Sequence, residues 1–157
     1  MRASAASLLL ATTACVASVR TTTTAHEPMG IEHINLTENW PYPFSSAVRV
    51  GNMLYLAGQM GTKIVDGAPK LVTGGIDAET KQTFENIKAI LAKAGSSLDN
   101  VIECKVMMAD MAEWPAMNVV YASYFPGKKP ARSAWGANGL ALGGRVEITC
   151  MAFVPHE

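Results

Sequence analysis

Alternating hydrophobic and polar residues predict a hairpin in the first part of the folded domain. Residues 45–50 (SSAVRV) form one extended segment, Gly51-Asn52 is a turn signal, and residues 53–57 (MLYLA) form the returning strand. The next stretch, residues 61–75, is rich in glycine and mixed polar residues. We expect a loop there with one short strand.

Hydrophobic residues at helical spacing predict two helices. The first begins at an N-cap, Asp77, and ends before Gly95, which fits a C-terminal stop. Its apolar stripe consists of Phe84, Ile87, Leu91 and Ala94, and its outward side chains are Lys81, Glu85 and Lys88. The second helix spans about residues 112–125 and carries four large side chains on one face, Trp114, Met117, Tyr121 and Phe125. Aromatic residues at this spacing are typical of a helix that packs on a core.

Two long strands are predicted in the second half of the chain. Residues 101–108 alternate, with Ile102, Cys104, Val106 and Met108 on one face and Glu103 and Lys105 on the other. The final strand, residues 146–154, has a core face of Val146, Ile148, Cys150, Ala152 and Val154. This order of elements predicts an α+β domain with both helices on one face of a mixed sheet.

The other face of the final strand is half apolar, since it carries Glu147, Thr149, Met151 and Phe153. A sheet face of this kind is usually covered, and both helices are already assigned to the first face. We therefore expect a second copy of the chain to cover it, in a homo-oligomer.

The composition indicates an N-terminal leader and argues against nucleic-acid and membrane partners. The 157 residues are 49% hydrophobic with a formal net charge of zero, so no basic surface points to nucleic acid. No apolar run is long enough to cross a bilayer, and we expect no membrane partner. Residues 1–25 are rich in Ala, Ser and Thr and contain no acid, which favours a mitochondrial targeting leader. A secretory signal and a cytosolic location are the alternatives. Residues 26–39 are expected to be a linker and residues 40–157 the domain.

The cysteines and histidines limit the possible chemistry. Cys15, Cys104 and Cys150 show no metal-binding spacing, and we expect buried free thiols in a reducing compartment. The histidines lie only near the two ends of the chain, at positions 26, 33 and 156. A serine–histidine or cysteine–histidine pair and a histidine metal site are therefore not expected in the core of the domain.

Arg132 and Glu147 are the candidate catalytic residues. Arg132 lies on a short extended segment, a glycine-rich turn follows, and Glu147 lies on the final strand, which we expect to be a neighbour. A guanidinium group suits a planar carboxylate, and a glutamate can take a proton from water. Spacing alone favours a simpler interpretation, a cross-strand salt bridge or two solvated side chains.

Several short motifs occur in the order found in one family. They are Gly51–Gln59 (GNMLYLAGQ), Glu85–Ile90 (ENIKAI), Ala109–Met111 (ADM), Asn118, Pro130–Ser133 (PARS) and Val146–Ile148 (VEI). With these motifs the chain resembles the reactive intermediate (imine/enamine) deaminase family, also called Rid or YjgF-like. The resemblance covers about residues 40–155.

The resemblance implies a chorismate-mutase-like fold, assembled as a barrel-like trimer with sites between subunits. It implies hydrolysis of 2-imino or enamine acids, such as 2-aminoacrylate and 2-iminobutanoate, to 2-keto acids and ammonia. Arg132 would hold the substrate carboxylate and Glu147 would activate water, with no cofactor and no metal. The positions that would contact substrate are Phe44, Ala57, Gly58, Asn118, Ser133 and Ala134.

The chain departs from the family at four positions. Phe44 stands where a tyrosine is common, Ala57 where many members have serine, and Ala134 where some have cysteine. Thr149 replaces a second acidic residue in the final strand. The hydroxyls missing at positions 44 and 57 leave open a protein that binds and protects small carboxylates without turnover. An endoribonuclease or translation inhibitor also stays open, in which Lys128, Lys129, Arg132 and Arg145 would form a basic surface beside aromatic residues.

Overall fold

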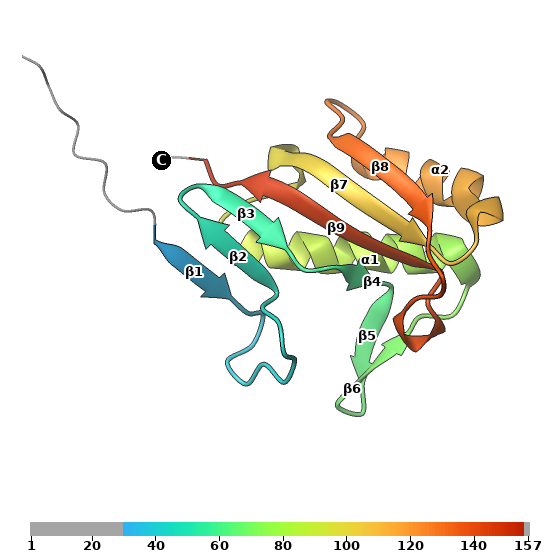
Figure 1. Cartoon of the computed structure of the whole chain (residues 1–157), viewed down its shortest axis with the longest axis horizontal. Coiled ribbons are helices and arrows are strands. Elements are labelled where there is room, and N and C mark those ends of the chain that lie inside the picture. The colour runs from blue at the N-terminus through green and yellow to red at the C-terminus, as the bar shows by residue number, and fades with distance from the viewer. Residues whose placement is uncertain (1–29, 156–157) are drawn as a thin grey trace, which may run out of the picture.

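A mixed seven-stranded sheet forms the centre of the computed structural model, which describes residues 30–155 (Figure 1). Its strands lie in the order β1-β2-β3-β9-β7-β8, and β4 also pairs with β9. Neighbouring strands are antiparallel except β7 and β8, which are parallel. The strands are β1 (Ile31–Ile34), β2 (Ala47–Val50), β3 (Met53–Leu56), β4 (Gln59–Met60), β7 (Val101–Met108), β8 (Ala131–Gly136) and β9 (Val146–Phe153).

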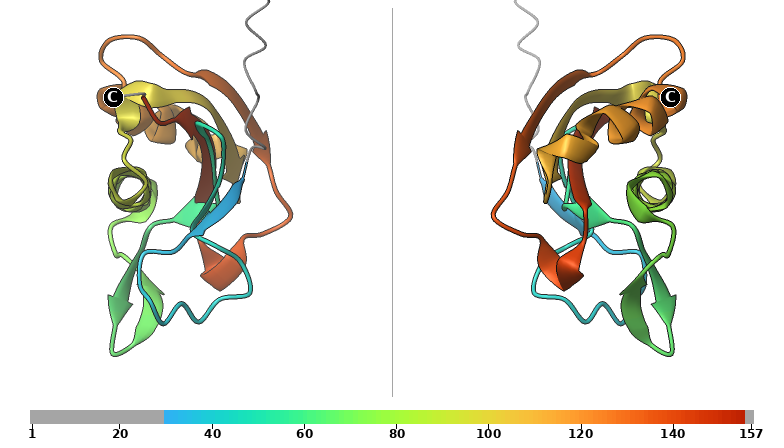
Figure 2. Two further views of the ribbon diagram at one scale, coloured as in Figure 1. Left: turned by 90° about the vertical axis from the view of Figure 1, so that its left-hand side faces the viewer. Right: turned by 90° about the vertical axis from the view of Figure 1, so that its right-hand side faces the viewer.

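Two helices, α1 (Gly75–Lys93) and α2 (Trp114–Tyr124), cover one face of this sheet, called here the inner face (Figure 2). Within residues 30–155, no α-helix lies on the opposite, outer face. Strands β5 (Thr62–Val65) and β6 (Ala68–Leu71) form a separate hairpin. Three short 3-10 helices connect the elements: η1 (Leu98–Asn100), η2 (Met111–Glu113) and η3 (Ala141–Gly143). The predicted α+β class, with two helices on one face of a mixed sheet, is confirmed, and no helix among the described residues is long and apolar enough to cross a membrane.

The hydrophobic core lies between the inner face and the two helices. Phe84 of α1 is fully buried, and its ring packs edge-on against Tyr121 and Phe125 at centroid distances of 5.3 and 5.7 Å. The predicted stripes of both helices supply this layer, since all of their members are buried except the partly buried Trp114. Burying side chains of this size contributes about 1.5–3 kcal/mol each.

The predicted β2–β3 hairpin is confirmed, while the start of the first helix is not. Gly51, at the tip of the hairpin, has a φ of 59°. Helix α1 begins at Gly75, two residues before the predicted N-cap, and Asp77 lies inside its first turn. Gly74 takes the capping position with a φ of 117°, a conformation that glycine adopts easily.

Three expectations about strands were wrong. Strand β1 pairs with β2 inside the stretch 26–39 that we interpreted as a linker. Only Ile34 of that strand is buried, so its hydrophobic pattern was too weak to detect. Residues 61–75 hold both strands of the β5–β6 hairpin instead of one. Ile102 is exposed, because a register shift between Val101 and Glu103 moves it off the inner face.

Cys104 and Cys150 are joined by a disulfide bond, so the prediction of free thiols was wrong for this pair. They lie opposite each other on β7 and β9, with Cα atoms 4.1 Å apart, and both are buried. The alternation placed each on the inner face correctly, but only the register between the two strands brings them together. Disulfides persist in oxidising compartments, and the cysteines therefore no longer favour a reducing one. Cys15 and the predicted leader, residues 1–25, lie outside the described residues.

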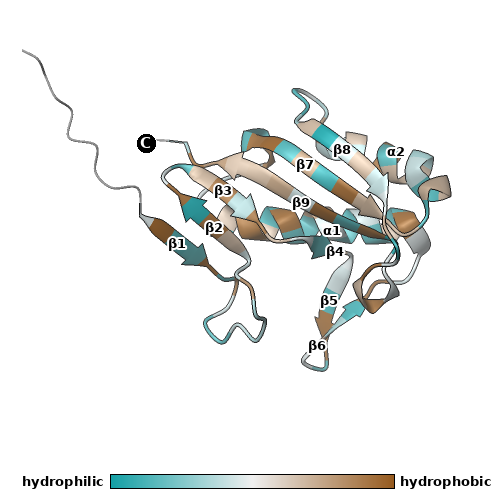
Figure 3. Ribbon diagram, viewed as in Figure 1, coloured by the Kyte–Doolittle hydropathy of each residue, from teal (hydrophilic) through white to brown (hydrophobic). Residues whose placement is uncertain are grey.

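The outer face remains partly open in the single chain. On β9 its residues are half-buried, while Tyr55 and Trp135 nearby are 45% and 42% exposed. Figure 3 shows mostly apolar colouring along β9, where both faces of the strand carry apolar residues, whereas apolar and polar bands alternate along β7. The apolar character fits the expected subunit contact, which stays a prediction.

Candidate functional site

Glu147 lies on the outer face at the start of β9, beside β4 and β7. Its register partners are Met60 on β4 and Met107 on β7. Its carboxylate forms no hydrogen bond or ion pair with any residue in the range 30–155. Partial burial raises the pKa of Glu147 above its ordinary value of 4.5. A carboxylate with a raised pKa and no partner is a suitable general base.

Gly58, between β3 and β4, lies directly against this carboxylate. A Cβ atom at position 58 would lie 1.9 Å from Oε1 of Glu147. Any side chain here would therefore displace the carboxylate. Glycine lets the backbone and Glu147 approach each other closely, as at other sites where a ligand meets the main chain.

Arg132 is held on the other side of the sheet, against α2. It is the register partner of the buried Cys104, and paired residues of adjacent strands point to the same face. Its Nη1 atom donates a hydrogen bond of 2.6 Å to Oδ1 of Asn118. The guanidinium carbon lies 4.6 Å from the ring centroid of Tyr121 and 5.7 Å from that of Trp114. These contacts fix the guanidinium and leave other N–H donors for a ligand.

The hydroxyl of Tyr121 is buried and has no hydrogen-bond partner among the described residues. Burial raises the pKa of Tyr121 to about 12, and the positive charge of Arg132 opposes this rise. The sequence indicated only a core aromatic here. The helical spacing from Asn118 to Tyr121, which puts both beside Arg132, was the signal for a second role.

Arg132 and Glu147 form no salt bridge, and they lie on opposite faces of the sheet. We had expected their strands to be neighbours, and this prediction was wrong, because β7 lies between β8 and β9. The cross-strand ion pair that spacing favoured is therefore absent from the described residues. One chain presents the two groups separately, with Arg132 on an edge strand.

The other residues predicted to bind substrate are spread over three places. Ala57 follows β3, and its N–H donates to the carbonyl oxygen of Ser46 at 3.0 Å. Phe44 is exposed on the loop between β1 and β2, where its ring stacks on Tyr42 at 5.5 Å. On β8, Ser133 and Ala134 alternate: the first is exposed opposite Lys105, and the second packs against the core.

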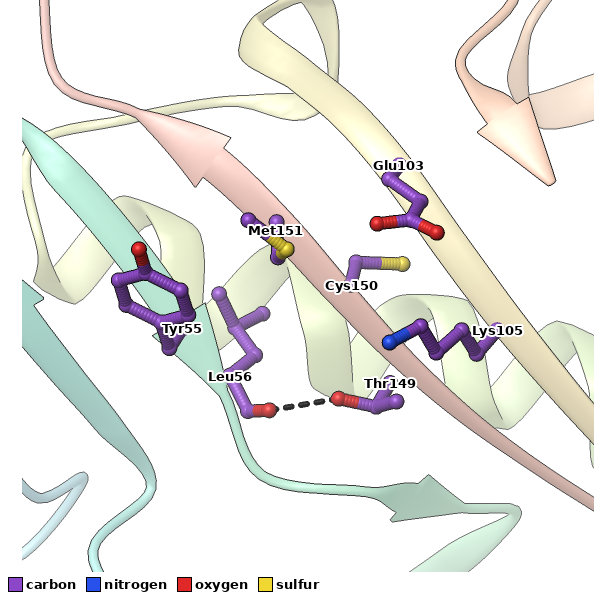
Figure 4. Close-up of a pocket in the computed structure, with 7 residues that line it drawn as sticks. All are labelled: Tyr55, Leu56, Glu103, Lys105, Thr149, Cys150 and Met151. Atoms are coloured by element: carbon purple, nitrogen blue, oxygen red, sulfur yellow. Dashed lines mark hydrogen bonds between the residues drawn. The ribbon is translucent and has the colours of Figure 1, made fainter.

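A cavity of about 140 Å³ on the outer face was not predicted (Figure 4). It begins two residues beyond Glu147, where Thr149 donates a hydrogen bond of 2.7 Å to the carbonyl oxygen of Leu56. Glu103 and Lys105 of β7 also line it. The alternation placed these two charges outward, and nothing in the pattern showed that they border a cavity.

These features define a small α+β protein with an unpartnered carboxylate on an open sheet face and an anchored guanidinium at the sheet edge. The model of the family described as "Endoribonuclease L-PSP" matches residues 37–154. The chain is 40% identical over 110 residues to the mouse (Mus musculus) 2-iminobutanoate/2-iminopropanoate deaminase, covering 70% of this chain and 80% of that protein. It is 33% identical over 110 residues to Reactive Intermediate Deaminase A, chloroplastic, of Arabidopsis thaliana, covering 70% and 58%.

Among solved structures, yeast Mmf1 matches with a TM-score of 0.73 and 33% identity, covering 80% of this chain and 100% of that one. The chain belongs to the Rid/YjgF/L-PSP family, which confirms the resemblance read from the motifs.

Proposed function

We propose that the protein hydrolyses reactive 2-imino and enamine acids, such as 2-aminoacrylate and 2-iminobutanoate, to 2-keto acids and ammonia. The observation that carries this proposal is the carboxylate of Glu147, unpartnered among the described residues and set against the bare backbone of Gly58. The names of the mouse and Arabidopsis relatives, both deaminases, support it.

Glu147 acts as the general base for addition of water to the C=N bond. It accepts a proton from water as the oxygen bonds to C2, and the π electrons of the imine pass to nitrogen. The proton is then delivered to that nitrogen, which gives a carbinolamine. The hydroxyl proton of the carbinolamine passes to the nitrogen as the C=O bond forms and the C–N bond breaks, and ammonia leaves. An enamine first becomes the imine by taking a proton at C3 and losing one from nitrogen. An imine carbon is already electrophilic, so a positioned water and a fixed substrate are sufficient for this step.

Arg132 holds the substrate carboxylate, in an orientation set by Asn118 and the rings of α2. Because Arg132 and Glu147 face opposite sides of the sheet, we propose that each site combines Glu147 of one subunit with Arg132 of the next. A trimer closed in this way would bury the apolar outer face. The separate location of Phe44 is also consistent with a site shared between chains.

The test uses 2-iminopropanoate generated by an amino-acid oxidase, with residual imine trapped by semicarbazide and ammonia measured. Glu147→Gln and Arg132→Ala should each lower kcat/KM at least about a hundredfold. The matched controls are Glu85→Gln and Arg49→Ala, which alter exposed ion pairs away from the site. Unchanged hydrolysis in both site variants would contradict the proposal.

Two outcomes would favour the other functions. Binding of 2-ketobutyrate by calorimetry without any ammonia release would indicate a protective binding protein. RNA cleavage that weakens steeply with salt and survives Glu147→Gln would indicate the endoribonuclease named in the family description.

A further inference from the structure

Two polar side chains of α1 hold the main chain on both sides of Glu147. They are Glu79 and Asn86, which lie two turns apart on the same side of the helix. In Figure 1, α1 passes behind β4 and β9, the strands that carry Glu147 and one of its register partners. Because the carboxylate of Glu147 has no bonded partner within residues 30–155, its position is set by this main chain.

Glu79 fixes the start of β9. Its side chain is buried, and its Oε2 atom accepts a hydrogen bond of 2.8 Å from the backbone N–H of Arg145. The carbonyl oxygen of Arg145 accepts a hydrogen bond of 3.0 Å from the N–H of Ala109, which directly follows β7. Both backbone groups of Arg145 are therefore bound two residues before Glu147.

Asn86 fixes β4. Its Nδ2 atom donates two hydrogen bonds of 2.9 Å, to the carbonyl oxygens of Met60 and Thr62. Its Oδ1 atom accepts a hydrogen bond of 2.8 Å from Nε2 of Gln82. Both N–H donors of the amide are thus used, and its orientation is determined. Met60, which Asn86 binds, is the register partner of Glu147 on β4.

Strand β4 also connects α1 with the backbone that meets the carboxylate. Gly58, which lies against Oε1 of Glu147, is two residues before Met60 on the same segment. The segment approaches α1 closely, since a Cβ atom at Gly61 would lie 2.5 Å from Cα of Glu79. A movement of β4 along α1 would therefore displace both the strand partner of Glu147 and the backbone against its carboxylate.

Hydrogen bonds of this kind add a positional constraint that the core alone does not give. The hydrophobic effect is non-directional, so apolar packing tolerates small displacements of a helix on a sheet. A hydrogen bond weakens steeply when its geometry is lost. General-base catalysis is sensitive to such displacements, because a shift of about 1 Å can lower the rate about a hundredfold.

We propose that Glu79 and Asn86 are positioning residues for Glu147: from behind the sheet they hold the start of β9 and β4 so that the carboxylate stays in place. This inference rests on the proposed hydrolysis at Glu147. It gives the polar residues of α1 a role in the rate of the reaction and none in binding the substrate carboxylate.

The first test is Asn86→Leu, which keeps a similar volume and removes both hydrogen bonds to β4. With 2-iminopropanoate as substrate, kcat per binding site should fall about tenfold. The affinity for 2-ketobutyrate should change less than about twofold, because Arg132 and Asn118 lie on another part of the sheet. Calorimetry with 2-ketobutyrate also counts the binding sites, so unfolded chains do not lower the measured kcat.

The second test compares Glu79→Leu with Glu79→Gln. Leucine cannot accept the hydrogen bond from the N–H of Arg145, and kcat per site should fall about tenfold. Glutamine keeps an acceptor oxygen, so Glu79→Gln should retain kcat within about threefold. Asn86 is only half-buried and provides an independent variant if Glu79→Leu does not fold.

Thr80→Val is the matched control. Thr80 is fully buried on the same helix, and its hydroxyl donates to the carbonyl oxygen of Ile76 inside that helix, at 2.7 Å. This variant should lower the free energy of unfolding and leave kcat per site unchanged. Unchanged kcat in both Asn86→Leu and Glu79→Leu, or an equal loss in Thr80→Val, would overturn the inference while the unmodified protein still hydrolyses the imine.

Hydrogen exchange gives a readout that needs no turnover. In Asn86→Leu, the backbone amide hydrogens of the β4–β9 pair should exchange about tenfold faster, and those of the β1–β2 pair should not change. Thr80→Val should leave the β4–β9 pair unchanged. Unaltered exchange of this pair in Asn86→Leu would overturn the inference. No turnover of any imine by the unmodified protein would instead contradict the proposed function, and the inference with it.

Discussion

The two faces of the sheet are made by the same strands, yet they differ in almost every physical property. Along β9, the inner residues Val146, Ile148 and Ala152 are completely buried under the helices, whereas Glu147 and its outer neighbours are half-buried. The inner face carries a disulfide and a continuous core, and the outer face carries a cavity and the carboxylate of Glu147, which has no partner in the part of the chain that the structure describes. Along one strand, the inner residues thus belong to the core and the outer residues to the candidate site. Substitutions one position apart should therefore differ in their effects on the free energy of unfolding and on activity.

The largest difference should appear between Ile148 and Met151. Ile148→Ala removes a buried side chain from the core and should lower the free energy of unfolding by about 2–5 kcal/mol. Met151 lies on the outer face. If that face joins subunits, the loss in free energy of unfolding caused by Met151→Ala should grow with protein concentration. Urea unfolding at two protein concentrations measures both. An Ile148→Ala loss below that of Met151→Ala at every concentration would break the comparison.

The disulfide should contribute the next largest effect. Reduction opens a link that closes a 46-residue separation, and it should lower the free energy of unfolding by about 2–4 kcal/mol. A Cys104→Ala, Cys150→Ala double variant is the control, because its stability should not respond to the reductant. Equal stability of the oxidised and reduced protein would show that the disulfide of the inner face does not stabilise the fold.

Local patterns explain which of these features could be predicted from the sequence. The stripe around Phe84 and the alternation of β9 are short-range signals, and both faces of β9 were assigned correctly. The Cys104–Cys150 bond depends on the β7–β9 register, which sequence periodicity does not encode. Strand β1 has only one buried residue, so its sequence shows almost no hydrophobic alternation. The strand is defined mainly by its pairing with β2, which is a long-range contact.

The candidate site shows the same limit. The motifs singled out Arg132, Glu147, Gly58 and Asn118, and the structure brings them together in two pairs. That the pairs lie on opposite faces follows from the insertion of β7 between β8 and β9, a long-range property of the sheet. The Lys105 charge was visible in the sequence, but its place beside a cavity depends on residues from three strands.

Gly58→Ala should sharpen the comparison by lowering activity without a matching loss of stability. The new Cβ atom would meet the end of the flexible Glu147 side chain, which can turn away at little cost to folding. Moving the base in this way should lower kcat/KM by about tenfold or more, with a change in unfolding free energy below about 1 kcal/mol. Gly127→Ala is the control, since nothing lies within 4 Å of its added Cβ atom. Full activity in Gly58→Ala would show that the carboxylate position is not critical.

The smallest expected effect is the pH dependence of stability that Glu147 contributes. Burial raises its pKa in the folded protein above the ordinary value of 4.5, so the folded state binds the proton more tightly than the unfolded chain. The stabilisation from this group is then fully present below pH 4.5 and is lost as the pH rises through the raised pKa. Activity should follow the opposite course, because only the ionised carboxylate accepts a proton from water, so the acidic limb of kcat/KM should lie above pH 4.5. Glu147→Gln should flatten the stability change across this window. Unfolding curves of the unmodified protein and of Glu147→Gln across the window measure this change, and a flat difference between the two would show that the outer face leaves this carboxylate as free as an ordinary surface acid.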